Sequence, residues 1–224
     1  FPYTLRRCGI RVRTAVVAAA LVGMVVPIVW LRLSDRLNVG VRAPIRTGWG
    51  VDAERFPAAA ADFIEREQLP GPLLNNFDVG SYLLYRLYPT RRVFIAGSTS
   101  MYPASFFSAY KSGVIGGAPL AEIRGTYGTE TVVLDLASPV TADLIGRLAA
   151  APDWALVFLD HAGAVFVHVD DATRDVAARR IDLATRIREL ASTERQSPVL
   201  PAWLGGVPLV FPRFNVGMFA LAYG

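Results

Sequence analysis

The longest uncharged stretch of the chain lies near its N-terminus and runs from Thr14 to Leu31, TAVVAAALVGMVVPIVWL. Its eighteen residues, at about 1.5 Å rise per residue, span roughly 27 Å, close to the hydrocarbon thickness of a bilayer. The pattern therefore predicts a transmembrane helix over residues 14–32. The alternative is a secretory signal peptide, which we favour less because the run is long and no small-x-small cleavage site follows Trp30.

The charges that flank this span predict its orientation. Four arginines precede it, whereas Arg32 and Arg36 follow it with Asp35 between them. Because arginine and lysine are enriched on the cytoplasmic side of membrane spans, we expect residues 1–13 in the cytoplasm and the rest of the chain outside, at the cell (inner) membrane. The four arginines are Arg6, Arg7, Arg11 and Arg13.

Beyond a connector over 33–52, helical and strand patterns alternate through residues 53–195. Strands are predicted where short apolar, β-branched runs lie between turn residues: 72–76, 91–97, 129–137, 154–160 and 164–169. Helices are predicted over 53–69, 79–88, 101–115, 118–128, 138–153 and 170–193. This order indicates a single α/β domain whose mixed sheet has about five strands, parallel in part and ending in an antiparallel hairpin that turns at Gly163.

Several polar residues stand where helices are expected to begin. Asp78 is placed to cap the helix over 79–88, and Ser138 precedes Pro139 at the start of another helix. Asp171 is expected to be the N-cap of the last helix. That helix is predicted to be amphipathic, with Asp175/Arg179 and Asp182/Arg186 paired at i, i+4. Its expected inward-facing residues are Val176, Ile181, Ala184, Ile187 and Leu190.

The C-terminal segment, residues 196–224, is apolar again but is interrupted by Pro208, Pro212 and Arg213. We interpret it as a linker followed by a truncated helical segment that resembles the first helix of a tetratricopeptide unit. We interpret both ends of the chain as positions at which a longer protein has been cut.

Composition and charge narrow the function classes. Hydrophobic residues make up 53% of the chain, and the formal charge of +4 is explained by the four arginines before the predicted span. No basic stripe with interleaved aromatic residues is present, so a nucleic-acid partner is not expected. The single cysteine, Cys8, cannot form an internal disulfide bond.

Residues for familiar catalytic chemistry are scarce. The two histidines are His161, in a predicted hairpin turn, and His168, at the end of a strand. The chain lacks a G-x-S-x-G motif and a phosphate-binding loop, so we predict no catalytic residue in it. Asp170 and Asp171 lie near His168 and could form a small metal cluster with it, but Asp171 is better explained as the helix N-cap. No metal or other cofactor is expected in this part of the protein.

A polar cluster follows the first predicted strand. Asn75, Asn76 and Asp78 stand at its carboxyl end, where the next helix begins. Ser98 and Tyr102 follow the second predicted strand. The carboxyl ends of parallel strands form the usual ligand crevice of an α/β sheet, so these residues predict a polar binding pocket. The alternative is that they serve only as caps and turn residues.

The stretch NNFDVGSYLLYRLYPTRRVFIAGSTSMYP, with the helix before it, resembles a known family over residues 52–103. It is similar to the extracytoplasmic domain that follows the last spans of bacterial multi-pass GT-C-type, lipid-linked-sugar glycosyltransferase-like proteins, which tetratricopeptide repeats often follow. The matching residues are Asn75, Asn76, Gly80, Tyr82, Leu83, Arg92, Val93, Phe94, Ile95, Gly97 and Tyr102. Ala96 and Ser98 stand where the family has Asp and Arg, so an ionic role of that pair is lost here.

The resemblance implies that catalytic carboxylates, and any divalent metal, lie in loops between earlier spans. This domain would then bind the acceptor or cap the membrane site, through Asn75, Asn76, Asp78, Tyr82, Ser98 and Tyr102. The implied partners are the bilayer, a polyprenyl-linked sugar, and a glycan or protein acceptor. The alternative function is a non-enzymatic, membrane-anchored binding or scaffold domain that recruits proteins through downstream tetratricopeptide repeats.

Overall fold

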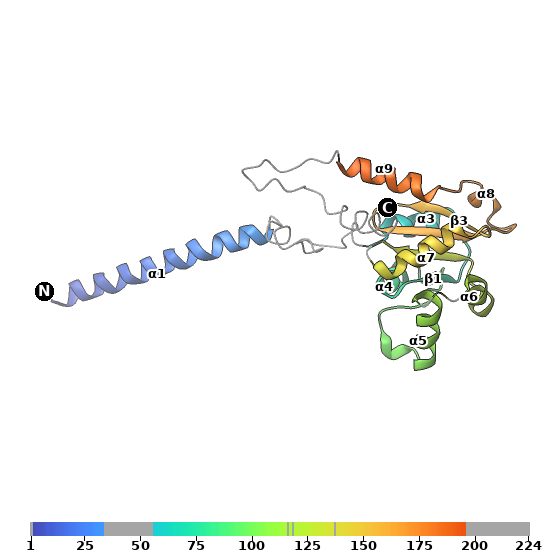
Figure 1. Ribbon diagram of the computed structural model, residues 1–224. Coiled ribbons are helices and arrows are strands. Elements are labelled where there is room, and N and C mark those ends of the chain that lie inside the picture. The colour runs from blue at the N-terminus through green and yellow to red at the C-terminus, as the bar shows by residue number, and fades with distance from the viewer. Residues whose placement is uncertain (1, 34–55, 116, 118, 137, 196–224) are drawn as a thin grey trace. The chain divides into compact units, whose positions relative to one another are not determined.

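A computed structural model describes residues 2–33, 56–115, 117, 119–136 and 138–195 (Figure 1). The chain divides into two compact units, Phe1–Gly50 and Val51–Gly224. The predicted connector beyond residue 33 and the predicted helical segment over 196–224 lie outside the described residues.

The first unit contains one long helix, α1 (Pro2–Leu33). Within it, Thr14–Leu31 is long and apolar enough to cross a membrane. Among the described residues, the apolar side chains of this segment are exposed, Val16 by 63% and Met24 by 60%. This pattern is what a membrane span needs, because its side chains are solvated by lipid rather than by other residues.

The second unit is built on a mixed sheet of four strands in the order β1-β2-β4-β3. The strands are β1 (Leu73–Asn75), β2 (Thr131–Asp135), β3 (Trp154–Leu159) and β4 (Gly163–His168). β1 is parallel to β2, β2 is antiparallel to β4, and β3 and β4 form an antiparallel hairpin. The predicted α/β class, the partly parallel sheet and the closing hairpin are confirmed.

Helices pack on both faces of this sheet. One face carries α3 (Ala58–Arg66), α4 (Phe77–Leu87) and α8 (Arg174–Ala177). The other carries α5 (Ala104–Tyr110), the π-helical turn η2 (Lys111–Ile115), α6 (Leu120–Tyr127), α7 (Pro139–Ala150) and α9 (Leu183–Arg195). Since both faces are covered, every residue of β2 is buried, as its unbroken apolar run predicts.

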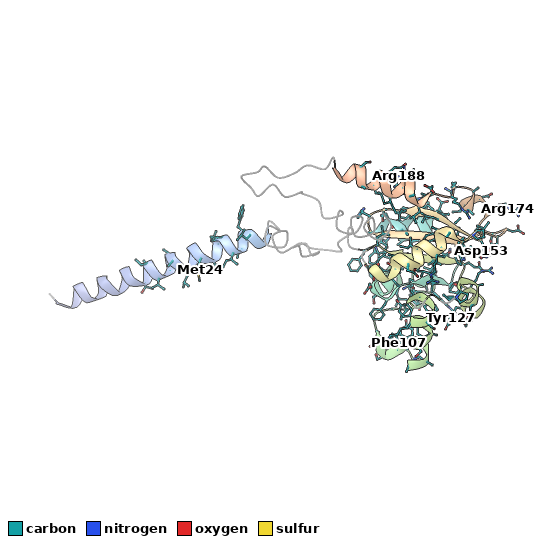
Figure 2. The ribbon with its side chains drawn as sticks, in the orientation of Figure 1. Met24, Phe107, Tyr127, Asp153, Arg174 and Arg188 are labelled. Atoms are coloured by element: carbon teal, nitrogen blue, oxygen red, sulfur yellow. The ribbon has the colours of Figure 1, made fainter. Side chains whose placement is uncertain are left out.

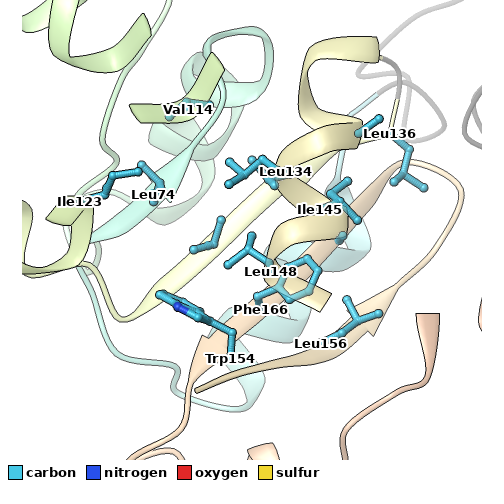
Figure 3. Close-up of a cluster of buried hydrophobic side chains, with 14 of the residues drawn as sticks. Leu74, Val114, Ile123, Leu134, Leu136, Ile145, Leu148, Trp154, Leu156 and Phe166 are labelled. Carbon is cyan, nitrogen blue, oxygen red and sulfur yellow. The ribbon is translucent and has the colours of Figure 1, made fainter. Parts of the chain in front are cut away.

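Alternate strand residues point into the two hydrophobic clusters. Val133 and Val165 belong to the cluster under α3 and α4, whereas Leu134 and Phe166 pack beneath α7. Figure 3 shows the second cluster, with Ile145 and Leu148 of α7 facing the strands. Successive residues of a strand point to opposite faces of the sheet, and here both sets are apolar. The sheet is therefore the central layer of a three-layer domain.

Residues 91–97 differ from the predicted strand. They contribute one isolated parallel bridge, between Leu73 and Val93, and the short helical turn η1 (Thr99–Met101) follows. The physical reason is that side chains replace the strand ladder: the amide of Phe94 donates to Asn75 Oδ1 (2.9 Å), and the carbonyl of Ile95 accepts from Asn75 Nδ2 (2.8 Å). The segment lies beside β1 without regular pairing.

The hairpin turn depends on close packing at Gly163. A Cβ atom there would lie 2.8 Å from Cβ of Pro57, and the backbone φ is not in the left-handed region. The Asp160 carboxylate accepts hydrogen bonds from the amides of Ala162 and Gly163, both at 2.8 Å. Glycine is therefore required by the approach of the segment that leads into α3, while Asp160 shapes the turn.

The structure corrects one of the two predicted helix starts and confirms the other. α4 begins at Phe77, so Asn76 is its N-cap residue and Asp78 lies in the first turn. The predicted start of α7 at Ser138 and Pro139 is confirmed, although the Ser138 side chain makes no capping bond. Instead, the Thr141 hydroxyl donates to the Ser138 carbonyl at 2.7 Å.

The last predicted helix is two helices, α8 and α9, separated at residues 178–182. Thr173 is the N-cap residue of α8, so Asp171 is not. The predicted i, i+4 pairs are replaced: Arg179 pairs with Glu67, and Arg186 pairs with Glu189 at 3.0 Å. The break lets the amide of Ile181 donate to the Leu156 carbonyl (2.8 Å), which anchors the start of α9 to the sheet. Of the expected inward-facing residues, Ala184 is exposed and the other four are half-buried.

Candidate functional site

The carboxyl ends of β1 and β2 lie side by side, because these two strands are parallel neighbours in register from Leu73↔Thr131 to Asn75↔Val133. Four polar residues meet there, and we call them the β1–β2 edge: Asn76, Asp78, Tyr110 and Asp135. They come from the end of β1, the first turn of α4, the end of α5 and the end of β2.

Asn76 links the two strand ends through its side chain. Its Oδ1 accepts from the backbone amide of Asp135 at 3.2 Å, which explains why it does not cap α4 in the usual way. Its Nδ2 lies 3.5 Å from Oδ2 of Asp78. Asn76 is buried, so its carboxamide is held in one orientation between two carboxylates.

Asp135 is the buried acid of the edge. Its side chain is only 4% exposed, and burial raises the pKa of this carboxyl group; the nearby charge of Asp78 raises it further. Hydrogen bonds from Asn76, from the Ser138 amide (3.2 Å) and from the Thr141 hydroxyl oppose this rise. A carboxyl group with a raised pKa at the end of a parallel strand is more frequent at functional sites than elsewhere.

Tyr110 completes the edge from the other side. Its hydroxyl oxygen accepts from the amide of Phe77, the first residue of α4, at 2.9 Å. Burial raises the pKa of the Tyr110 hydroxyl, and the carboxylates of Asp78 and Asp135 raise it further. The hydroxyl therefore stays protonated at neutral pH and keeps its own hydrogen to donate.

Aromatic rings gather next to Tyr110. Phe94 packs 5.0 Å from Phe106 and 6.4 Å from Tyr110, measured between ring centroids. Tyr127 meets Phe94 edge-on at 4.7 Å. Phe107 and Tyr127 mark this cluster in Figure 2. These rings are half-buried, so part of their apolar surface remains accessible beside the polar groups.

Asn75 bonds to backbone groups of its own and a neighbouring segment. Its side chain is fully buried, and its amide group bonds to the backbone of Asn76, Phe94 and Ile95. Gly80 makes this possible, because a Cβ there would lie 1.9 Å from the Ile95 carbonyl oxygen. We call this arrangement of Asn75, Gly80 and residues 94–95 the Asn75 clasp.

The other predicted residues lie apart from the edge. Tyr102 accepts from the Ala96 amide (2.9 Å) and so closes the loop over 96–102. Ser98 is exposed and lies 3.4 Å from the Ser100 hydroxyl. Tyr82 belongs to the cluster under α3 and stacks on Phe56 at 5.1 Å. Of the six predicted residues, the structure therefore brings Asn76 and Asp78 together at the edge.

Two residues of the edge were not predicted from the sequence. Asp135 ends the buried strand TVVLD and precedes a helix, which is the same signal that drew attention to Asn75 and Asp78. Tyr110 carries no such signal, because its contact with Phe77 joins segments 33 residues apart.

The histidines lie at opposite ends of β4. His161 lies in the hairpin turn, as predicted, and is half-buried. His168 lies at the other end, near Glu130 and Asp170.

Comparisons of this chain with protein-family models, with curated proteins and with solved structures found no match.

Proposed function

We propose that this chain is the membrane-anchored, extracytoplasmic part of a lipid-linked-sugar glycosyltransferase-like protein, and that its β1–β2 edge binds the sugar of an acceptor. In this proposal α1 spans the cell membrane with residues 1–13 in the cytoplasm. The family resemblance of residues 52–103 and the arginine distribution around α1 support it.

The observation that carries the proposal is the buried carboxamide of Asn76, which lies between the carboxylate of Asp78 and the backbone amide of Asp135. Sugar hydroxyls both donate and accept, so the exposed carboxylate of Asp78 can accept from them. The buried Asn76 amide and the protonated Tyr110 hydroxyl lie behind this carboxylate. The neighbouring rings of Phe94 and Phe106 offer apolar area for the faces of a sugar ring.

The role of the edge is binding rather than bond cleavage. Asp135 is buried, and its carboxyl group already accepts from the Ser138 amide at 3.2 Å. The catalytic carboxylates, and any divalent metal that assists them, are expected in loops between upstream spans. The reading frame that encodes this chain is therefore expected to specify a series of membrane spans before α1.

The test uses the full chain in lipid nanodiscs, titrated with cellopentaose, maltopentaose and chitopentaose, and with pentaglycine as a non-sugar probe. We expect at least one sugar to bind with a Kd below about 1 mM, and Asp78→Asn to weaken it by about tenfold, which corresponds to one lost charge-assisted hydrogen bond. Isothermal calorimetry measures both values.

The matched control is Asp175→Asn. Asp175 is an exposed aspartate in the first turn of α8, and the register of β4 against β2 places α8 at the opposite end of the sheet. Equal affinity of the wild type and both variants would contradict the proposal. That result, together with recovery of proteins bound to the downstream segment, favours the scaffold alternative instead.

A further inference from the structure

A second polar cluster lies at the end of the sheet opposite the β1–β2 edge. We call it the His168 cluster: Glu130, Asp153, His168 and Asp170. Strand ends bring it together, because the His168 amide donates to the Glu130 carbonyl and the Val169 amide donates to the Asp153 carbonyl, both at 2.9 Å. Asp153 is labelled at this end of the domain in Figure 2.

The imidazole of His168 faces two carboxylates on one side. Its Nδ1 lies 3.7 Å from Oε2 of Glu130 and 3.7 Å from Oδ2 of Asp170, and the three atoms lie within 4.8 Å of one another. The side chain is 15% exposed, but Nδ1 itself is closed off from solvent and has no hydrogen-bond partner among the described residues. A buried polar atom without a hydrogen-bond partner is rare in native proteins and is often explained by a bound water molecule or ion.

The spacing of the three atoms suits a metal ion. At 3.7 Å they are too far apart for hydrogen bonds. Ligands bound tetrahedrally at about 2.0–2.1 Å lie roughly 3.3 Å from one another, so small side-chain movements bring all three atoms within bonding distance of one ion.

The surrounding residues hold the ligands in place. On the other side of the ring, Nε2 lies 4.0 Å from Oδ2 of Asp153, and a carboxylate there favours a proton on Nε2, which leaves the Nδ1 lone pair free. Asp170 uses Oδ1 to accept from the amides of Ala172 and Thr173, so its Oδ2 is the oxygen that faces His168. The hydrogen bonds that Asp170 accepts in this turn are therefore compatible with metal binding through its other oxygen.

The charge of the cluster points to a divalent cation. Glu130, Asp153 and Asp170 carry three negative charges, and Arg124, which bonds to Glu130 Oε1 at 2.9 Å, carries one positive charge. With a neutral imidazole the sum is two negative charges, which a divalent ion balances. Imidazole nitrogen with carboxylate oxygens is a donor set typical of zinc and its first-row neighbours.

We propose that Glu130, His168 and Asp170 bind one divalent transition-metal ion of the zinc class. The ion ties the start of β2 to the end of β4 and to the turn before α8, and its remaining coordination position takes water or an exogenous ligand. This site does not depend on the proposed function of the β1–β2 edge, and it differs from the sequence expectation that capping alone explains these aspartates.

The test uses the full chain in detergent micelles, without a polyhistidine tag, after removal of metals with a chelator. Co²⁺ is added while its visible d–d absorption and the tryptophan fluorescence are recorded. The Trp154 ring lies 5.5 Å from the His168 ring, so bound Co²⁺ quenches the share of fluorescence that Trp154 contributes among the four tryptophans. We expect saturation at one equivalent and displacement by Zn²⁺.

Three substitutions test where the metal ion binds. His168→Gln is expected to weaken binding more than about 100-fold, since loss of even an outer-shell partner typically costs 10–100-fold. His161→Gln, at the only other histidine, is the matched control and is expected to bind like the wild type. Trp154→Phe is expected to bind Co²⁺ without the quenching.

Three results would overturn the proposal: no Co²⁺ or Zn²⁺ binding to the wild type below about 1 mM, binding that persists in folded His168→Gln, or binding lost in folded His161→Gln. If His168→Gln does not fold, the wild-type titration still tests the proposal. Saturable Co²⁺ binding that leaves the Trp154 fluorescence unquenched would place the ion elsewhere and contradict it.

Discussion

The Gly80→Ala substitution tests whether the Asn75 clasp holds residues 91–97 against the sheet. Gly80 lies inside α4, and alanine at an unhindered helix position stabilises a protein by roughly 1 kcal/mol relative to glycine. Here the added Cβ would lie 1.9 Å from the Ile95 carbonyl oxygen and 2.8 Å from Nδ2 of Asn75. Cβ contacts below 3.0 Å essentially do not occur, so the Ile95 backbone must move by at least about 1 Å.

That movement breaks the bonds that define the clasp. The bonds from Asn75 Nδ2 to the Ile95 carbonyl (2.8 Å) and from the Phe94 amide to Asn75 Oδ1 (2.9 Å) both lengthen beyond hydrogen-bonding distance. Leaving a buried group unpaired costs about 1–3 kcal/mol, and since the bond of Phe94 is only part-buried we take about 1–2 kcal/mol for each of the two bonds, which gives about 2–4 kcal/mol. After the roughly 1 kcal/mol gain in helix propensity, the expected net loss of unfolding free energy is about 1–3 kcal/mol.

The assay is equilibrium urea unfolding of the full chain in micelles, followed by tryptophan fluorescence. Gly125→Ala is the control, because Gly125 also lies inside a helix, α6, and a Cβ there meets nothing within 4 Å. We expect Gly125→Ala to be neutral or stabilising. If Gly80→Ala behaves in the same way, the close approach of α4 to Ile95 is not present in solution and the reasoning fails.

Three other substitutions test separate parts of the domain. Asn75→Ala is expected to lower the unfolding free energy by about 2–4 kcal/mol, and to expose the Phe94 amide to hydrogen exchange, because its acceptor is removed. Burial raises the pKa of Asp135 in the folded state, so the unfolding free energy of the wild type falls as pH rises from about 4 through that pKa. Over this range, urea unfolding is expected to show the unfolding free energy of Asp135→Asn rising relative to that of the wild type. A difference that stays constant with pH would contradict the raised pKa. Gly163→Ala is expected to cost about 1–3 kcal/mol in the same assay, because its Cβ would lie 2.8 Å from Pro57, and an unchanged midpoint would contradict that packing.

The pattern of hydrophobic residues was sufficient to predict the layers of the domain. Strands such as β2, which are buried on both faces, are recognised in the sequence as unbroken apolar runs. The long uncharged run predicts the part of α1 from Thr14 to Leu31. Residues 91–97 look equally strand-like, but the Asn75 side chain takes the place of a neighbouring strand there. A local pattern carries no information on which side chain from another segment will bond to the backbone.

The candidate site was predicted only in part for the same reason. Asn76 and Asp78 follow a strand, which makes them visible in the sequence, whereas Tyr110 reaches the edge from a helix that follows 33 residues later. The break between α8 and α9 was hidden because residues 170–193 keep a helical period across it. Bonds to the sheet, such as that from Ile181 to Leu156, decide where the helix ends.

The binding of a sugar at the β1–β2 edge is tested most directly by backbone amide NMR of the full chain in nanodiscs, titrated with the tightest-binding pentasaccharide. We expect saturable chemical-shift changes at the amides of Phe77 and Asp135, which bond to Tyr110 and Asn76, and unchanged shifts at Asp170 and Thr173 at the other end of the sheet. Shifts that appear at neither Phe77 nor Asp135, while sugar still binds, would contradict the proposed site.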